Sequence, residues 1–306
     1  MTLISVVIPV YNAADTLPAT LASLTAQIHR DWQAILVEDG STDASWAIAR
    51  SLADQDPRLK LLRNPGKGPS AARNHGARHA NGDILAFCDA DDLWERTKLR
   101  DVATALAAPD TDATFGQIAF FREDPQIIRT RSRVPAGPVT VPMLMGENPV
   151  CTLSNLSLRR ATFQTLGGFR EDIVHNEDLE FLIRLVGAGH RLIGTDAQHV
   201  LYRLSPTGLS ADLTAMRAGR RSALATAARL GFRPSPASEA VHLRYLARRA
   251  LRLGAPAHIV RRLVRDGCRT DASAFLRPLR RGGLIALAAL LLPFLPRRTR
   301  RFLFSN

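Results

Sequence analysis

Short apolar runs alternate with helical patterns over the first hundred residues. Runs rich in β-branched residues and leucine occupy residues 4–10, 33–39, 59–64 and 83–89. Between the first two runs, residues 15–27 carry apolar positions at helical spacing. This alternation is typical of parallel strands joined by crossover helices. We therefore predict an α/β fold with a mostly parallel central sheet, flanked by helices, that binds ligands beyond the carboxyl ends of its strands.

Polar and small residues predict where some helices begin. Gly40 marks a turn, and Ser41 or Thr42 is predicted to cap the helix after it. Residues 65–80 form a loop rich in glycine and proline that enters another helix. A further helix is predicted to start near Asn176 and to use it as a cap.

The second half of the chain has a mixed pattern and then becomes helical. Residues 113–121 and 152–160 are predicted strands. From about residue 212 the chain is rich in alanine, leucine and arginine and is predicted to be helical without internal repeats. We place a boundary within residues 205–212.

The net charge of +13 is unevenly distributed. Residues 1–199 contain 20 Lys or Arg and 24 Asp or Glu, whereas residues 200–306 contain 21 and 4. Such a basic segment binds nucleic acid, an anionic membrane surface or an anionic substrate, and charge alone does not choose among them. Cys88, Cys151 and Cys268 lie far apart without metal-ligand spacing, which predicts neither disulfides nor a zinc site.

Three carboxylates stand within four positions directly after the strand predicted at 83–89: Asp89, Asp91 and Asp92. Helix capping is one explanation, because Asp92 and Glu95 have the spacing of a capping box. Capping contributes only about 1 kcal/mol, and it leaves Asp89 and the repulsion between like charges unexplained. A divalent cation is the other explanation, since Mg²⁺ and Mn²⁺ prefer oxygen ligands and Mg²⁺ is often held by one or two carboxylates with substrate phosphates.

Polar motifs follow three of the predicted strands: PVYN, EDGSTD and DADD. With two later stretches they resemble the family-2 inverting glycosyltransferases of the GT-A fold, from about residue 3 to residue 210. The matching stretches, in the order of the family, are SVVIPVYN, LVEDGSTD, GPSAARNHGARHANGDILAFCDADD, LGGFREDIVHNED and YRLSPTGLS. The resemblance implies a Rossmann-like GT-A catalytic domain over residues 1–210 and a helical, basic region over 211–306. Residues 1–110 would be the nucleotide-binding half and 111–210 the acceptor-binding half.

The resemblance implies a metal-dependent reaction that moves a sugar, with inversion, from a nucleotide donor to an acceptor hydroxyl. UDP is the expected nucleotide, and Mn²⁺ or Mg²⁺ the expected cofactor. A sugar or a lipid-linked sugar is the expected acceptor, in the synthesis of bacterial cell-surface polysaccharide or glycolipid.

Nucleotide contacts are implied for residues in four of the matched stretches. Tyr11 would flank a uracil and Asp39 would accept a hydrogen bond from its N3–H, roles that suit an aromatic face and an acceptor-only carboxylate. A boundary aromatic and a turn residue are the structural explanations. Arg73 follows a glycine-rich loop at a helix start, where anions bind readily. The full set of expected nucleotide contacts is Pro9, Tyr11, Asp39, Lys67, Arg73, Asn74, Asp89 and Arg203.

The resemblance assigns the metal to the DADD motif, with Asp91 or Asp92 as the direct ligand. A lone His199 is a candidate substitute ligand, because Ser205 stands where the family often has histidine. The resemblance makes Asp178 the general base, with Glu177 and Asn155 in acceptor or supporting positions. Acidic residues in the first turn of a helix are the structural explanation for Glu177 and Asp178.

Residues 277–304 place an apolar run, 284–295, between two arginine clusters. A twelve-residue helix is about 18 Å long, too short for a ~30 Å hydrocarbon core. It is predicted to lie on an anionic membrane surface, and a core helix with arginines at its ends is the alternative. The first residues lack signal-peptide features. We expect a cytoplasmic protein, peripheral on the inner face of the cytoplasmic membrane.

Other function classes fit the sequence less well. A basic nucleic-acid-binding protein is suggested by the charge, but the basic segment matches no nucleic-acid module, and we expect no nucleic acid partner. A nucleotidyltransferase that forms nucleotide sugars is expected to carry a Gly-rich, Lys/Arg-bearing loop after its first strand, and PVYNAADT is not such a loop. A binding-only relative is disfavoured by the retained Asp91, Asp92 and Asp178.

Overall fold

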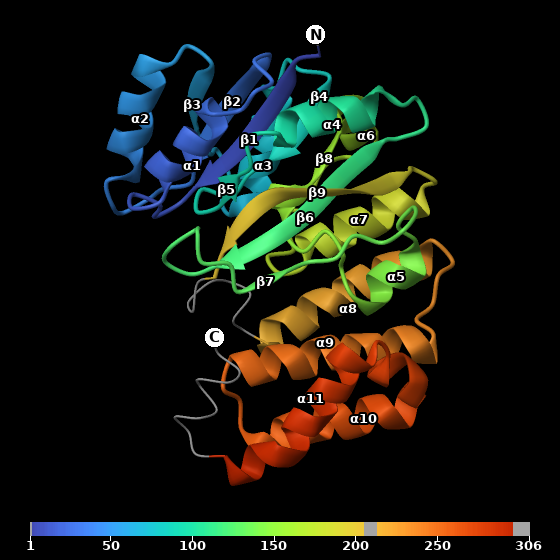
Figure 1. Cartoon of the computed structure of the whole chain (residues 1–306). Coiled ribbons are helices and arrows are strands. Elements are labelled where there is room, and N and C mark those ends of the chain that lie inside the picture. Colours follow the sequence, from blue (N-terminus) through green and yellow to red (C-terminus); the bar gives the residue numbers. More distant parts are fainter. Residues whose placement is uncertain (1, 205–212, 296–306) are drawn as a thin grey trace. The chain divides into compact units, whose positions relative to one another are not determined.

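The computed structural model describes residues 2–204 and 213–295. The chain divides into two compact units (Figure 1). Unit 1 contains residues 1–139 and 149–205, and unit 2 contains residues 140–148 and 206–306. The predicted boundary at 205–212 lies outside the described residues. The predicted functional division of the chain stays a prediction.

Unit 1 is built on one mixed sheet of nine strands among the described residues, and the predicted parallel half is confirmed. Strands β1, β2, β3 and β4 run parallel in the order β3-β2-β1-β4. The sheet continues as β8-β6-β9-β5, with β7 beside β6; β6 and β9 are parallel, and the other pairs are antiparallel. The strands are β1 Ile4–Val10, β2 Trp32–Glu38, β3 Leu59–Arg63, β4 Ile84–Phe87, β5 Leu93–Trp94, β6 Ala113–Phe121, β7 Thr130–Arg131, β8 Ser157–Arg159 and β9 Leu192–Arg203.

Helices cover both faces of this sheet because each strand alternates its side chains between the faces. Ile4, Val6 and Ile8 share a core with apolar residues of α1, α2 and α4. On the other face, the backbone of α3 approaches Val7 closely at Gly76, where a Cβ would lie 2.4 Å from a Val7 methyl. The helices of unit 1 are α1 Leu17–Thr25, α2 Ser45–Gln55, α3 Pro69–Arg78, α4 Lys98–Ala107, α6 Arg160–Thr165 and α7 Glu177–Gly187, with a 3-10 turn η1 at Leu153–Asn155.

Three local predictions are wrong. Helix α2 starts at Ser45, and the Asp43 carboxylate accepts its amide N–H, so neither Ser41 nor Thr42 caps it. Asn176 precedes α7 in the left-handed region without a side-chain cap. The strand predicted at 152–160 is reduced to 157–159 by the turn η1.

The capping box at Asp92 and Glu95, the alternative explanation of the acidic cluster, does not form. Strand β5 follows Asp92 directly and pairs with β9, and α4 begins only at Lys98. Asp92 therefore caps no helix. Helix capping therefore does not explain the acidic cluster.

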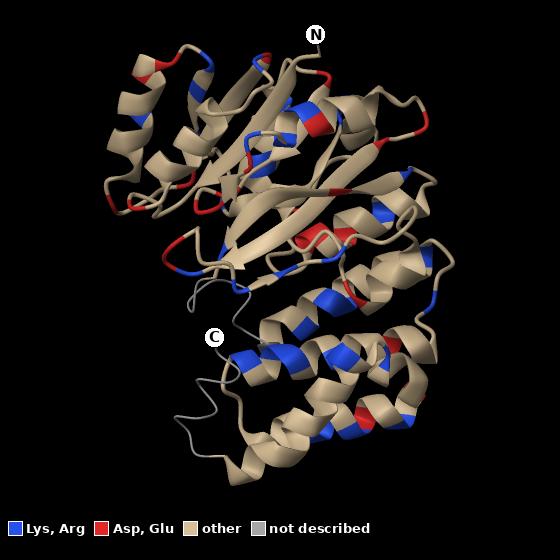
Figure 2. Cartoon of the chain, in the orientation of Figure 1, with Lys and Arg blue, Asp and Glu red and all other residues tan. Residues whose placement is uncertain are grey.

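Unit 2 is helical, as predicted for the C-terminal part. Its core is rich in alanine and includes Phe275, whose ring lies against the backbone at Gly267. Helix α10 is interrupted at Asp271, where φ is −160°. Lys and Arg are frequent on the helices of this unit (Figure 2). The helices are α5 Val141–Gly146, α8 Leu213–Arg229, α9 Pro236–Arg252, α10 Ala257–Leu276 and α11 Leu279–Leu291, followed by a 3-10 turn η3 at Leu292–Phe294.

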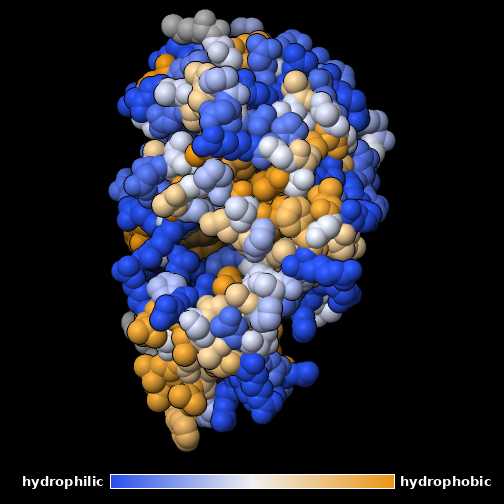
Figure 3. All heavy atoms as spheres, turned by 90° about the vertical axis from the view of Figure 1, so that its right-hand side faces the viewer, coloured by the Kyte–Doolittle hydropathy of each residue, from blue (hydrophilic) through white to orange (hydrophobic). Residues whose placement is uncertain are grey.

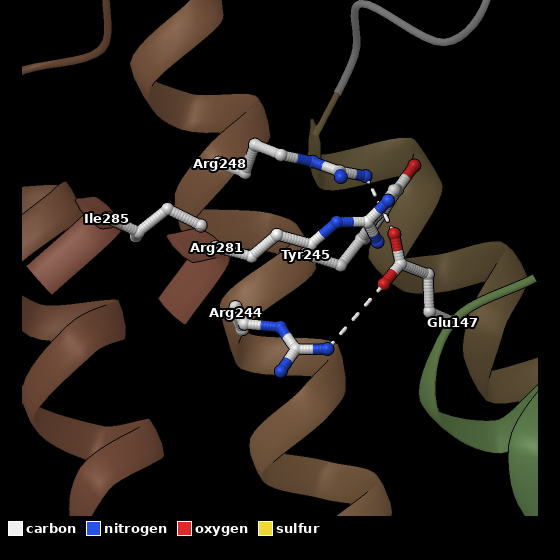
Figure 4. Close-up of a pocket in the computed structure, with 6 residues that line it drawn as sticks. All are labelled: Glu147, Arg244, Tyr245, Arg248, Arg281 and Ile285. Atoms are coloured by element: carbon white, nitrogen blue, oxygen red, sulfur yellow. Dashed lines mark hydrogen bonds and ion pairs between the residues drawn. The ribbon is translucent and has the colours of Figure 1, made fainter. Parts of the chain in front are cut away.

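Glu147 is one of the acidic residues in unit 2, and arginines surround it (Figure 4). Its carboxylate accepts a hydrogen bond of 2.7 Å from Arg248 and lies 3.8 Å from Arg244. Arg281 lines the same small pocket. Glu147 therefore holds the segment 140–148 against α9.

No helix in the part of the chain that the structure describes is long and apolar enough to cross a membrane.

Candidate active site

The loops after β1 and β2 meet at the carboxyl edge of the parallel strands. The side chain of Asn12 accepts a 2.8 Å hydrogen bond from the Thr42 amide, and the Asn12 amide donates to the Ser41 hydroxyl at 3.1 Å. Asn12 has a φ of 46°, which asparagine tolerates better than most residues. These contacts place Tyr11 and Asp39 at one edge of the sheet.

Asp39 organises the loop that enters α3. Its Oδ1 accepts a hydrogen bond from the side-chain amide of Asn64 at 2.7 Å, and its Oδ2 accepts one from the backbone N–H of Gly68 at 2.9 Å. The Lys67 ammonium donates to the Asp39 carbonyl at 2.7 Å and lies 5.1 Å from the centre of the Tyr11 ring. Tyr11 itself is 55% exposed. The structure thus brings together three predicted nucleotide contacts and leaves the aromatic face of Tyr11 open to a ligand.

Asp89, the first acidic residue of the turn, makes three hydrogen bonds, one through its backbone and two through its carboxylate. The Asp89 amide donates to the Ser154 hydroxyl at 2.9 Å, and the Thr152 hydroxyl donates to Asp89 Oδ2 at 3.1 Å. Arg73 donates to Asp89 Oδ1 at 2.6 Å. With both oxygens engaged, the Asp89 carboxylate has a defined orientation.

Asp91 and Asp92 differ in access to solvent. Asp91 is partly exposed, whereas Asp92 is fully buried. Burial first, and then repulsion from Asp89, raises the pKa of Asp91 to about 6. The same causes, with Asp91 added, raise the pKa of Asp92 well above its usual range. A bound cation at this turn would offset both effects.

Asp92 connects the acidic turn to the protein interior. Its Oδ1 accepts from the Arg203 amide at 3.0 Å, and its Oδ2 is buried without a hydrogen-bond partner among the described residues. Lys98 is also buried: its ammonium donates to the Ser154 carbonyl at 3.0 Å and lies 4.5 Å from the centre of the Trp94 ring. Burial lowers the pKa of Lys98 to about 7, against the attraction of Cys88 and Asp92.

Arg73 joins the acidic turn to the start of α7. Its guanidinium lies 2.6 Å from Asp89 and 3.2 Å from Glu177, and the residue is only 5% exposed. Burial opposes its charge, but Asp89 and Glu177 outweigh burial and raise the pKa of Arg73. Two carboxylates 88 positions apart in the chain therefore share one buried cation.

The first turn of α7 carries Glu177 and Asp178 side by side. Burial and repulsion from Asp178 outweigh the attraction of Arg73 and raise the pKa of Glu177 to about 7. Asp178 is half-buried, and its charge also acts on Arg73. The start of a helix stabilises negative charge. This position in α7 therefore offsets part of the repulsion between Asp178 and Glu177.

The shifted pKa of Glu177 predicts a pH-dependent stability. The unfolded chain loses this proton near pH 4.5, whereas the folded chain keeps it to about pH 7. The free energy of unfolding should therefore fall as pH rises between these values, by up to about 3 kcal/mol. Denaturant titrations at several pH values check this, with Glu177→Gln as the reference without the titrating group. A wild-type minus variant difference that is constant from pH 5 to pH 8 would contradict the burial of this carboxyl.

Asn74 uses its side-chain amide within the protein. Its Nδ2 donates to the Phe169 carbonyl at 2.8 Å and to Glu171 at 2.9 Å, and its Oδ1 accepts from the Phe169 amide at 2.9 Å. It thus fixes the turn that leads to α7 onto α3. The predicted nucleotide contact stays a prediction, and the observed partners give Asn74 a positioning role.

Two other predicted residues lie in the interior. Asn155 is fully buried, and its amide bonds to the backbone of Gly116 and Val150, so only a supporting role fits it. His199 is fully buried with Nε2 3.6 Å from Asp101. Burial, then Lys98, lowers its pKa to about 3.

His199 does not join the acidic turn as a third metal ligand. Among the residues that the structure describes, no three His, Cys, Asp or Glu side chains are grouped to hold a metal ion. A catalytic Mg²⁺ does not require such a cage, because it keeps waters and substrate phosphates as ligands. Arg203 instead lies at the turn, with its Nε donating to the Asp91 carbonyl at 3.1 Å.

Pro9 lies in β1 beside Val37, one residue before the end of the strand. Four residues that shape the site were not predicted from the sequence. The partners that explain them are distant in the chain. They are Asn64, Lys98, Thr152 and Ser154.

Residues 5–167, more than half of the chain, match the family model described as Glycosyl transferase family 2. An uncharacterized glycosyltransferase of Haemophilus influenzae is 39% identical over 121 residues, which are 39% of this chain and 48% of that protein. The Escherichia coli UDP-Glc:alpha-D-GlcNAc-diphosphoundecaprenol beta-1,3-glucosyltransferase WfgD is 37% identical over 98 residues, 32% of this chain and 38% of that protein. The matched stretches thus span less than half of both relatives.

Two solved structures share the fold. S. aureus TarS in complex with UDP-GlcNAc has a TM-score of 0.63 at 17% identity, over 94% of this chain and 89% of that chain. Mannosyltransferase PcManGT from Pyrobaculum calidifontis, in complex with GDP-Man and Mn²⁺, has a TM-score of 0.63 at 22% identity, over 99% of this chain and 84% of that chain.

The strand order, the acidic turn at the carboxyl edge of the sheet and the family match lead to one conclusion: the chain belongs to glycosyltransferase family 2 and has the GT-A fold.

Proposed function

We propose that the protein is an inverting glycosyltransferase that moves a sugar from a nucleoside diphosphate, UDP being the favoured nucleotide, to an acceptor hydroxyl. One observation carries this proposal. The buried Arg73 ties Asp89 of the acidic turn to Glu177 beside Asp178, so a donor-binding group and a candidate base are held as one unit.

The nucleotide end of the donor is assigned to the edge after β1 and β2. The exposed ring of Tyr11 offers a stacking face. Asp39 accepts two hydrogen bonds, and each carboxylate oxygen has a second lone pair for a base N–H. Lys67, exposed beside both, supplies positive charge for a phosphate. UDP-glucose is the donor named for WfgD, which supports a uridine nucleotide.

The residues of the acidic turn fit a divalent cation. Asp91 and Asp92 carry raised pKa values because of burial first and then repulsion from neighbouring carboxylates of the turn. Bound Mn²⁺ or Mg²⁺ would supply charge neutralisation for the departing diphosphate. Asp91 is the better direct ligand because it is partly exposed, whereas Asp92 is enclosed and bonded to the Arg203 backbone. The Mn²⁺ in PcManGT supports a metal of this kind.

The chemistry is a single in-line displacement at the anomeric carbon. The acceptor oxygen forms a bond to that carbon as the bond to the diphosphate oxygen breaks, and the leaving nucleoside diphosphate takes the electron pair. Asp178 receives the acceptor proton. One displacement from the opposite side inverts the anomeric configuration.

The metal assignment predicts a difference between neighbouring carboxylates. Calorimetry should show UDP binding to the wild type that requires Mn²⁺ or Mg²⁺ and is lost with chelator. Asp91→Asn should lose the metal-dependent binding of UDP, because a neutral amide is a weaker ligand for a hard cation. Asp92→Asn is the matched control and should retain metal-dependent UDP binding. Metal-independent binding by the wild type would remove the cation from the scheme, and loss only in Asp92→Asn would exchange the two assignments.

We also propose that the protein attaches to an anionic membrane surface through residues 277–304, at the inner face of the cytoplasmic membrane. Six apolar side chains of α11 and η3 are exposed, up to 84% at Phe294. The rest of this segment, residues 296–304, lies outside the described residues. Attachment would bring the enzyme to a lipid-linked acceptor, as the acceptor named for WfgD is a diphosphoundecaprenol.

A further inference from the structure

A groove between α10 and α11 combines cationic and apolar side chains. Its volume is about 640 Å³, inside the range of ~300–1,000 Å³ usual for small-ligand pockets. Both helices belong to unit 2. The lining residues are His258, Arg261, Arg262, Val264 and Arg265 from α10, and Ala286, Ala289 and Leu290 from α11.

Helical spacing separates the two kinds of side chain. Positions 258, 261, 262 and 265 follow the i, i+3, i+4, i+7 pattern of one helix face. Positions 286, 289 and 290 do the same on α11. One wall of the groove is therefore cationic and the other apolar.

The cationic wall keeps a surplus of positive charge. Asp266 lies 3.6 Å from Arg262 and 3.4 Å from Arg265. Both arginine side chains are more than half exposed, so these pairs are weak. One carboxylate balances only one of the three arginines, which leaves two positive charges for an anion.

The apolar wall continues into an exposed apolar surface. Leu284, Leu287, Leu290 and Leu291 of α11 are about half exposed or more, and Phe294 follows them. Figure 3 shows hydrophobic residues gathered at the lower end of the view, where Figure 1 places the end of α11. Soluble monomers rarely expose contiguous apolar surface of this kind unless it is a binding site.

We propose that the groove binds one anionic phospholipid, with its headgroup phosphate against Arg261 and Arg265 and an acyl chain over Ala286 and Leu290. Only a molecule that is anionic at one end and apolar along its length satisfies both walls. A soluble phosphate would leave the leucines in water, and an acidic peptide would leave the apolar wall uncovered. The inference rests on the proposed membrane attachment and adds a discrete site to it, remote in sequence from the acidic turn.

Vesicle sedimentation of the full chain tests the charge of the site. The wild type should bind phosphatidylglycerol vesicles and ignore phosphatidylcholine vesicles. Arg261→Gln with Arg265→Gln should weaken binding about thirtyfold, from about 1 kcal/mol for each of the two arginines. Arg221→Gln with Arg233→Gln removes the same charge from exposed positions elsewhere in unit 2 and should keep most of the affinity. Equal losses in the two double variants would overturn the site in favour of diffuse attraction.

A second variant tests the groove without changing charge. Ala286 is partly exposed in its wall, and Ala286→Trp should fill it and displace the acyl chain. Native mass spectrometry with short-chain phosphatidylglycerol should detect one bound lipid on the wild type and none on this variant. Thermal melts and donor hydrolysis should stay as in the wild type, because the groove lies outside the acidic turn and unit 1.

The outcomes separate this proposal from the ones it builds on. Vesicle binding that Ala286→Trp leaves unchanged would overturn the groove site and keep membrane attachment through α11. A wild type that binds no vesicles would overturn both. Binding of inorganic phosphate without vesicle binding would make the groove a soluble-anion site and overturn the lipid. None of these results bears on sugar transfer, which is assayed separately with a soluble acceptor.

Discussion

Replacing Asp178 by asparagine is expected to abolish sugar transfer while metal-dependent nucleotide binding persists. Removal of a general base typically costs ~10² to 10⁴ in rate, and the asparagine amide cannot take the acceptor proton. The isosteric change keeps the volume of the side chain in the first turn of α7. The loss is measured as the rate at which nucleoside diphosphate is released from a nucleotide sugar in the presence of acceptor. Calorimetry measures the retained nucleotide binding.

Asp172→Asn is the matched control for this experiment. Asp172 lies six residues before Asp178, is 65% exposed and pairs with Arg170, so the substitution removes the same charge from the same segment. It should leave the rate of transfer unchanged. An Asp178→Asn enzyme that transfers sugar at the wild-type rate would assign the base elsewhere, with Glu177 next to be tested.

Replacing Arg73 by methionine is expected to cause the largest loss of folding stability, with loss of transfer. Methionine fills a similar volume but leaves Asp89 and Glu177 without their shared cation. Breaking a buried ion pair by removing one partner costs about 3–5 kcal/mol. Thermal and denaturant unfolding should show this cost, and transfer should fall because the orientation of Asp89 is lost.

Two further variants separate the shared charge from simple packing. Adding Glu177→Gln to Arg73→Met removes one of the two stranded carboxylates and should recover part of the lost stability. Arg78→Met changes an exposed arginine of the same helix and should have little effect. A double variant no more stable than Arg73→Met would mean that the buried guanidinium acts through packing alone.

The strand ends of the parallel sheet were readable because their signals are local. A buried parallel strand is a short continuous run of β-branched and apolar residues, and β1 and β6 begin and end at the residues predicted. The polar motifs begin where those runs stop. Local pattern alone was therefore enough to place Asp39 and the acidic turn at one edge of the sheet.

The helix caps were not readable, because the deciding partners come from elsewhere in the chain. Asp92 and Glu95 have the spacing of a capping box, yet residues 93–94 pair with β9. Pairing with a strand more than a hundred residues away overrides a local preference worth about 1 kcal/mol. Sequence spacing therefore located the acidic turn but predicted a helix directly after it, where the chain forms strand β5.

The parallel half of the sheet, the helical and basic C-terminal part, and the family whose motifs follow the strands could all be predicted from the amino-acid sequence. The folded structure was needed to show which carboxylates share Arg73, that Asp92 is enclosed while Asp91 is not, and that Asn155 and His199 face the interior. The reason is physical: periodicity and strand ends are encoded within a few residues, whereas burial and charge pairing depend on segments that meet only when the chain folds.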